Sequence, residues 1–269
     1  MIFVSAVVNP SVFGPDSAIW QINRERALLL GGPCAAILQV AHPQVALGVE
    51  RHSRFRQDAF GRLRRTLEAV YTVAFGPREE AEQMKARIAA IHRKVRGETP
   101  IRYSAFSPDA QLWVLATLIQ TALDVHERFY RPIPEARKAA YFADMKRFGE
   151  YFGLDRAFGP QTWPEFQSYY REMIAGDLLA SRPECVEAAR AVAVPRANWL
   201  ETAAALPIQF LVTEILPSPV REKLGFRSTP VNRALARAGE IFLPALIPRL
   251  PALLRFPKQY RDAIRPFSR

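Results

Sequence analysis

Apolar residues recur along the chain mostly at spacings of three and four, which places them on one face of an α-helix. No stretch shows the sustained alternation of apolar and polar residues that is typical of strands between turns. The pattern therefore predicts an all-α chain. We expect helices at 16–31, 33–52, 58–75, 77–96, 108–130, 134–152, 164–180, 183–192 and 198–216, and from 229 into the C-terminal region.

Prolines and glycines mark the boundaries of these helices. The chain has 22 prolines and 13 glycines, and most prolines fall at segment edges, where they can occupy the first turn of a helix. Gly31, Gly32 and Pro33 predict a tight turn between two apolar helices, and Pro43 predicts a kink in the second of them.

The C-terminal residues 241–269 combine an apolar composition with too many prolines for one regular helix. We expect a proline-rich helical arm made of short, broken turns. Two interpretations of this arm stay open. It packs on the body of the protein, as apolar termini usually do, or it contacts a membrane surface or a partner with the help of Arg249, Arg255, Lys258 and Arg261.

Length and composition predict one domain over residues 1–269, since 269 residues that are 49% hydrophobic can bury one substantial core. No apolar run reaches the roughly 18 residues of a membrane-spanning helix. The apolar residues 1–13 lack the basic region and cleavage site of a signal peptide. Cys34 and Cys185 lie far apart, which predicts no disulfide and a reducing compartment. We therefore expect a cytoplasmic location.

The formal net charge of +11 would attract nucleic acids or an anionic membrane surface. The basic residues are spread over many segments, and no DNA- or RNA-binding module is found, so nucleic acid is not expected as a partner. A solvated basic surface is the simpler interpretation, with a peripheral membrane contact as the alternative. No stable protein partner is predicted.

The chain has no nucleophile elbow, phosphate-binding glycine loop, HExxH motif or paired-cysteine metal site, and only four histidines. His92 follows Ile88 by four residues and Met84 by eight, on an apolar stripe that also holds Ile91 and Val95. The spacing predicts an inward-facing imidazole. Such a side chain is either a core histidine bonded to a carbonyl or a metal ligand, and haem needs only one such ligand from the chain.

The helix predicted at 58–75 carries Arg62 and, three residues later, Arg65 beside Thr66. Two guanidinium groups and a hydroxyl at the edge of an apolar face could stabilise a haem propionate or an oxygen species. From the pattern alone, a solvated basic helix face explains the same residues.

Several motifs in order give the chain a specific resemblance. The segment over residues 31–166 is similar to the catalytic domain shared by latex-clearing proteins (rubber oxygenases) and MpaB-type oxygenases, with a weaker helical similarity beyond it. The motifs that carry the resemblance are AHPQVALGVERHSRF, RLRRT, AFG, IHRKVRG and YSAFSPDAQLWV.

The resemblance implies a globin-like helical fold that binds haem b and cleaves carbon–carbon double bonds of isoprenoid chains with dioxygen. It implies that His92 is the proximal iron ligand and that Arg62, Arg65 and Thr66 lie on a helix passing the distal side. His52, in the RHS element, would approach the distal pocket, and His42, in the AHP element, would be structural. His126 is expected to be exposed or to cap a helix end.

The chain departs from the family pattern at two positions. Arg65 stands where latex-clearing protein has a lysine that can occupy the sixth coordination position. Arginine stays protonated and does not ligate iron, so an open or water-occupied distal position is implied. Leu115 stands where many relatives have a histidine, which puts an identical activity in doubt.

These observations predict an oxidoreductase that uses haem b iron and dioxygen to oxidise an apolar, isoprenoid-like small molecule or polymer. His92, Arg62 and His52 would contact the cofactor, and Arg62, Arg65 and Thr66 would serve the reaction. The alternative is a non-catalytic helical protein that binds haem or a hydrophobic ligand and contacts a membrane peripherally.

Overall fold

The computed structural model describes residues 11–53, 59–193 and 211–267, without the side chains of residues 59, 60, 62 and 63. Helices dominate this part of the chain, and one antiparallel pair of two-residue strands accompanies them, which confirms the all-α prediction. The elements are α1 (Ala18–Asn23), η1 (Arg26–Gly31), α2 (Gly32–Ala41), α3 (Pro43–His52), α4 (Ala59–Phe75), α5 (Arg78–His92), β1 (Arg96–Gly97), β2 (Tyr103–Ser104), α6 (Pro108–Phe129), α7 (Glu135–Glu150), α8 (Trp163–Ala175), α9 (Pro183–Ala193), α11 (Ser218–Lys223), α12 (Pro230–Leu246), η2 (Ile247–Arg249), α13 (Ala252–Arg255), α14 (Lys258–Ile264) and η3 (Arg265–Phe267).

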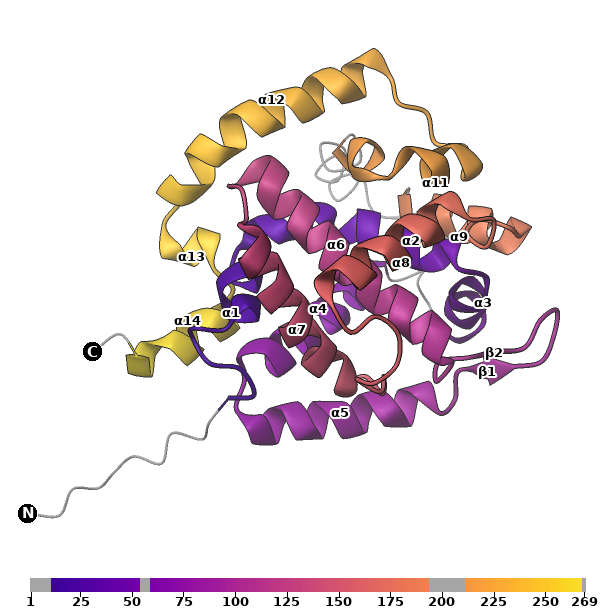
Figure 1. Cartoon of the computed structure of the whole chain (residues 1–269), viewed down its shortest axis with the longest axis horizontal. Helices are drawn as coiled ribbons and strands as arrows, with labels where there is room; N and C mark the ends of the chain where they lie inside the picture. The colour runs from indigo at the N-terminus through magenta and orange to yellow at the C-terminus, as the bar shows by residue number, and fades with distance from the viewer. Residues whose placement is uncertain (1–10, 54–58, 194–210, 268–269) are drawn as a thin grey trace, which may run out of the picture.

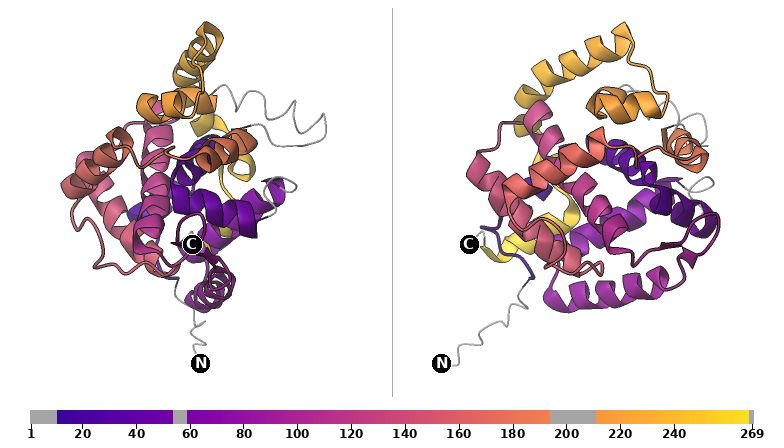
Figure 2. Two further views of the ribbon diagram at one scale, coloured as in Figure 1. Left: turned by 90° about the vertical axis from the view of Figure 1, so that its right-hand side faces the viewer. Right: turned by 45° about the vertical axis from the view of Figure 1, so that its right-hand side comes forward.

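The long helix α6 runs through the middle of the molecule, with α5 along one edge and α12 along the opposite edge (Figures 1 and 2). Helix α2 packs against α6 and α9, and α1 packs against α7. Two fully buried tryptophans connect neighbouring helices through hydrogen bonds from their indole N–H groups. Trp113 Nε1 donates to Leu38 O and Trp20 Nε1 donates to Ala74 O, both at 2.7 Å, so each ring is buried without an unpaired polar atom.

Local capping explains where several helices begin. The side chains of Ser17, Thr162 and Thr229 accept hydrogen bonds from the backbone N–H groups of Trp20, Glu165 and Asn232, at the starts of α1, α8 and α12. Prolines occupy the first turn of α3, α6 and α12. The predicted starts of α1, α6, α8 and α12 are therefore correct within a residue or two.

Four predicted helices end or break differently in the structure. The helix expected at 164–180 ends at Ala175, before Gly176. The helix expected at 33–52 is broken rather than kinked, since His42 is extended and the segments Arg26–Ala41 and Pro43–His52 meet at 105°; a residue before proline avoids the helical region. The helix expected at 16–31 divides into α1 and η1. The helix expected at 77–96 ends at His92, because Arg96 and Gly97 pair with Ser104 and Tyr103 in the small sheet.

From Ile247 onward the C-terminal arm consists of short elements, as predicted, and part of it packs on the body. The prediction is wrong for residues 241–246, which belong to the long helix α12 that continues through Pro244. Helix α14 lies against α4, and the buried ring of Tyr260 meets Trp20 and Phe75 edge to face, with ring centroids 5.9 and 5.4 Å apart. The packed interpretation therefore holds for α14.

Cys34 and Cys185 are both free and buried, as predicted. Within 11–53, 59–193 and 211–267, no single helix is long and apolar enough to cross a membrane; the segments Arg26–Ala41 and Pro43–His52 pass that test only as a bent pair. Residues 1–10 and most of the helix expected at 198–216 lie outside the described residues, although 211–215 are helical.

Candidate haem site at the end of α5

The candidate site lies at one end of an antiparallel pair formed by α4 and α5. The two helices are joined by a short turn and pack against each other, and an exposed ion pair between Glu68 and Arg87, at 3.7 Å, shows their register. The first half of α4 therefore runs beside the last half of α5, which ends at His92.

His92 is half-buried, and its Nδ1 atom is buried without a hydrogen-bond partner. The ring of Phe106 packs edge-on against it, with centroids 5.9 Å apart. Burial lowers the pKa of His92, so the imidazole is neutral at pH 7 and keeps a lone pair. A buried polar atom without a partner is costly, and this imidazole has the chemistry of a metal ligand.

Two exposed apolar side chains lie beside His92. Ile91 is 55% exposed and Phe106 is 41% exposed. The predicted inward stripe of α5 is correct for Ile88, which is buried, and for Met84, which packs against the core, but it is wrong for Ile91. Because α5 ends at His92, Ile91 has no following helical turn to cover it.

Arg65 and Thr66 are exposed on the half of α4 that pairs with the end of α5, and Arg64 is exposed beside them. The structure thus places Arg65, Thr66 and His92 on one helix pair, at the same end of it. Arg62 belongs to α4 as predicted, but its side chain lies outside the described residues.

His52 lies at the end of α3, and its Nε2 is 3.1 Å from the hydroxyl of Tyr103 on β2. The guanidinium of Arg51 lies over the same ring, 5.7 Å from its centroid. One nitrogen of His52 is therefore already occupied, and its described contacts join α3 to the strand pair that follows His92. The sequence pattern does not identify Tyr103 or Phe106 as site residues, although both belong to the YSAF motif.

The other histidines do not join this site. His42 is buried at the break between α2 and α3 with an unpartnered Nδ1, and burial lowers its pKa to about 4. His126 is buried rather than exposed, with Nδ1 2.9 Å from Arg131 O. This distance shows that it bonds the turn after α6, so the expectation of exposure is wrong.

Leu115, where many family members have a histidine, is buried in the middle of α6. It lines a cavity of about 10 Å³ together with Leu112, Phe142 and Phe166. The side chain therefore faces the packing of α6 against α7 and α8, and His92 is not among the residues that line this cavity.

No group of three His, Cys, Asp or Glu side chains that could hold a metal ion occurs in the described ranges. The donor set at the end of α5 is thus a single neutral imidazole with apolar neighbours. Zinc sites need three or four protein ligands, whereas haem brings four of its own and needs one from the chain. The residues present fit haem.

Comparisons with known proteins identify relatives. Residues 19–244 match the family model of the ER-bound oxygenase mpaB/B'/rubber oxygenase catalytic domain. Two curated proteins, uncharacterized protein Mb2261 of Mycobacterium bovis and uncharacterized protein Rv2237 of Mycobacterium tuberculosis, are each 29% identical over 146 residues. These matches cover 52% of the chain and 57% of each relative, so the chain spans little more than half the length of these relatives. No solved structure matches the chain. Since the family model covers most of the sequence, the chain belongs to the MpaB and rubber-oxygenase catalytic-domain family.

Proposed function

We propose that this protein is a haem b-dependent oxygenase that acts on an apolar substrate with dioxygen, and that His92 would hold the haem iron. The observation that carries the proposal is the buried, unpartnered Nδ1 of His92, in a chain of an oxygenase family. It marks an imidazole whose ring has apolar neighbours and no described hydrogen bond, so no described residue competes for this nitrogen.

Two features would favour metal binding by His92, namely its neutral imidazole and the restricted orientation of the ring. Burial favours the neutral ring, and the edge-on contact with Phe106 restricts its rotation. When bound, haem supplies the dioxygen chemistry, while its axial ligand and the polarity of its surroundings set its reactivity.

The basic residues of α4 would hold and orient charged groups on the side of the haem opposite His92. Arg62 and Arg65 carry permanent positive charges and donate hydrogen bonds in a planar fork that matches a carboxylate such as a haem propionate. Thr66, next to Arg65, adds a hydroxyl that can donate or accept one hydrogen bond. Since neither arginine can lose its proton in practice, neither competes with substrate for the iron.

The exposed side chains of Ile91 and Phe106 support an apolar substrate. Both lie next to His92 and expose more than a third of their surface, which a hydrophobic ligand would remove from water at a gain of roughly 25 cal/mol per Å². An isoprenoid-like compound is the substrate class that the family suggests.

The absorption spectrum of protein expressed with haem supplied tests the ligand assignment. We expect a Soret band that His92→Ala removes, while circular dichroism shows that the variant keeps its helices. His52→Ala is the matched control, because it removes a neighbouring imidazole whose nitrogen is bonded to Tyr103, and it should keep the band. An unchanged band in His92→Ala would contradict the proposal.

Oxygen uptake with polyisoprene and shorter terpenoids tests the reaction separately. We expect uptake by the wild-type protein and a loss of about tenfold or more in Arg65→Ala, with the Soret band retained, because removal of one preorganised charge typically costs this much. A haem-loaded protein that oxidises none of these compounds would instead support a haem or hydrophobic-ligand carrier.

A further inference from the structure

One face of helix α12 is exposed in the part of the chain that the structure describes. Seven of the eleven large apolar side chains that are exposed in the described ranges lie within residues 231–254, and Phe242 is the most exposed of them at 69%. The seven are Val231, Leu235, Ile241, Phe242, Leu246, Leu253 and Leu254.

The exposed residues of α12 form one continuous face. Val231, Leu235, Phe242 and Leu246 follow each other at intervals of four, seven and four residues, so they line up along the helix. The buried residues Asn232 and Ala236 lie on the side that packs toward α6. The apolar face therefore points away from the body of the protein.

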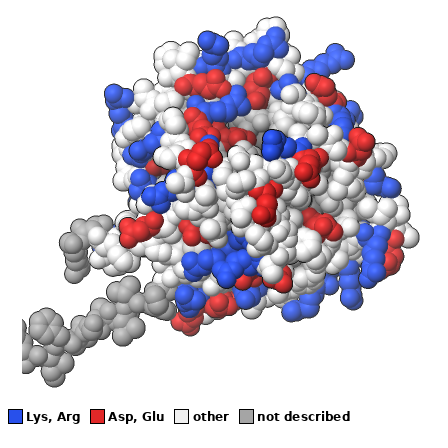
Figure 3. Space-filling view, viewed as in Figure 1, with Lys and Arg blue, Asp and Glu red and all other residues white. Residues whose placement is uncertain are grey.

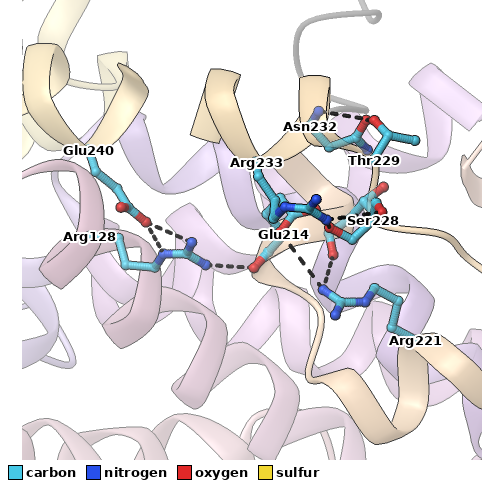
Figure 4. Close-up of polar contacts among 9 residues, drawn as sticks. Arg128, Glu214, Arg221, Ser228, Thr229, Asn232, Arg233 and Glu240 are labelled. Carbon is cyan, nitrogen blue, oxygen red and sulfur yellow. Dashed lines mark hydrogen bonds and ion pairs between the residues drawn. The ribbon is translucent and has the colours of Figure 1, made fainter. Parts of the chain in front are cut away.

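Polar contacts fix this orientation from the inner side. Arg128 of α6 donates to Glu240 through Nε at 2.9 Å and to Glu214 O at 2.8 Å (Figure 4). At the start of the helix, the N–H of Asn232 donates to Thr229 Oγ1 at 3.1 Å. Rotation of α12 to bury Phe242 would break the contact between Arg128 and Glu240, so the exposed face is part of the native packing.

Two further exposed leucines lie beyond α12. They are Leu253 and Leu254 of α13, which lies just below the C-terminal end of α12 (Figure 1). Arg255, the last residue of α13, links this helix to the N-terminal part of the chain through two hydrogen bonds to Glu25. We call these seven exposed side chains the outer α12–α13 surface.

Positive charge surrounds the outer α12–α13 surface. Glu240 is the only acidic residue among residues 227–255, and it is already paired with Arg128. Exposed arginines lie beside the apolar row, and Lys and Arg side chains gather along the rim that α12 occupies (Figure 3). They are Arg227, Arg233, Arg237 and Arg249.

We propose that the outer α12–α13 surface docks on an anionic membrane, with α12 lying in the plane of the interface. A helix with a wide apolar face flanked by arginines has the composition of such interfacial helices, and anionic headgroups would neutralise arginines that have no described carboxylate partner. A second copy of the chain fits less well, because a symmetric contact would bring like charges together. Helix α12 lies on the opposite edge of the molecule from α5, the helix that ends at His92 (Figure 1), so this proposal does not depend on haem.

Flotation of the full chain with lipid vesicles tests the proposal. We expect the protein to float with an equal mixture of phosphatidylcholine and phosphatidylglycerol, to bind much less to phosphatidylcholine alone, and to lose binding as salt increases. Phe242→Ser and Arg237→Glu should each reduce the bound fraction at least several-fold. The matched controls Leu178→Ser and Arg102→Glu change an exposed leucine and an exposed arginine elsewhere and should bind like the wild type.

A second measurement reports insertion directly. Phe242→Trp should show a blue-shifted emission on anionic vesicles and quenching by brominated acyl chains, because the indole would leave water. Absence of vesicle binding, an unchanged bound fraction in Phe242→Ser, or an equal loss in Leu178→Ser would overturn the proposal. A wild-type dimer that Phe242→Ser converts to a monomer would overturn it in favour of contact between copies.

Discussion

Arg255 and Glu25 form a two-point contact between the C-terminal arm and the N-terminal helices. Arg255 donates from Nε to Glu25 Oε2 and from Nη2 to Glu25 Oε1, each at 2.8 Å. The Glu25 side chain is only 1% exposed, so its charge must be compensated inside the protein. Arg255 supplies both hydrogen bonds, and Arg24 Nε lies 3.4 Å from Glu25 Oε1. The arm is thereby part of the folded body.

Removal of Arg255 should leave a buried carboxylate without its two hydrogen bonds and with Arg24 as its remaining ion-pair partner. We expect Arg255→Ala to lower the free energy of unfolding by about 3 kcal/mol, at the low end of the range for broken buried pairs because Arg24 remains, measured by urea denaturation. The matched control is Lys258→Ala, which breaks a well-exposed ion pair with Asp262 and should cost less than about 1 kcal/mol. Equal losses in the two variants would show that burial of Glu25 is not the cause.

His42 should make the protein less stable in mild acid. Burial lowers its pKa from 6.5 to about 4, so the unfolded chain takes up a proton between these values while the folded chain does not. Stability is constant above pH 6.5 as far as this group is concerned, and it falls by about 3 kcal/mol as the pH drops to 4. His42→Asn should remove this dependence in urea titrations, whereas His52→Asn, at an exposed site, should keep it.

Asp124 should make the protein less stable as the pH rises, which is the opposite of the effect of His42. Burial raises the pKa of this carboxyl from 3.8 to about 6, although Gln120 Nε2 donates to it at 2.7 Å. The folded chain therefore holds a proton that the unfolded chain releases, and stability falls by about 3 kcal/mol as the pH rises through this range. Asp124→Asn should be more stable than the wild type at pH 7. Asp177→Asn, at a fully exposed site, should not differ from the wild type.

Gly97 is required where the strand pair turns back after His92. A Cβ at this position would lie 2.6 Å from the Tyr103 ring, so we expect Gly97→Ala to cost about 1 to 3 kcal/mol of stability and to weaken the Soret band by loosening the support of Phe106. Gly14→Ala is the control, since a Cβ there meets nothing within 4 Å. Wild-type stability in Gly97→Ala would show that the ring moves aside freely.

Introducing the histidine that many relatives have at position 115 should not be tolerated here. Leu115 is buried against Phe142 and Leu154, so an imidazole would lose its hydrogen bonds to water. We expect Leu115→His to lower the free energy of unfolding by about 2 to 4 kcal/mol, against little change in Leu178→His at an exposed position. A fully stable Leu115→His protein would mean that this core has room and partners for a polar ring.

The sequence predicted the features that depend on near neighbours. Ser17, Pro108 and Thr229 mark the starts of their helices because a cap or a first-turn proline acts within one turn. The helical face of His92 followed from its spacing to Ile88 for the same reason. The all-α class required no more than this periodicity.

Features that depend on distant residues could not be predicted. Helix α5 ends at His92 because Gly97 pairs with Tyr103, and nothing within the helix itself indicates that end. The contact of His92 with Phe106 and that of His52 with Tyr103 arise from the same strand pair. His126 seemed exposed because it is near a helix end, but the turn at Arg131 folds back over it.

The contact between Arg255 and Glu25 also bears on where the protein can be cut. Similarity to the family ends at residue 244, yet the partner of Glu25 stands at position 255, and Tyr260 completes the ring cluster around Trp20. A fragment trimmed to the family boundary would keep the buried carboxylate and lose the arginine that donates to both of its oxygens. The region that matches the family is thus shorter than the region that must be expressed for the protein to keep these contacts.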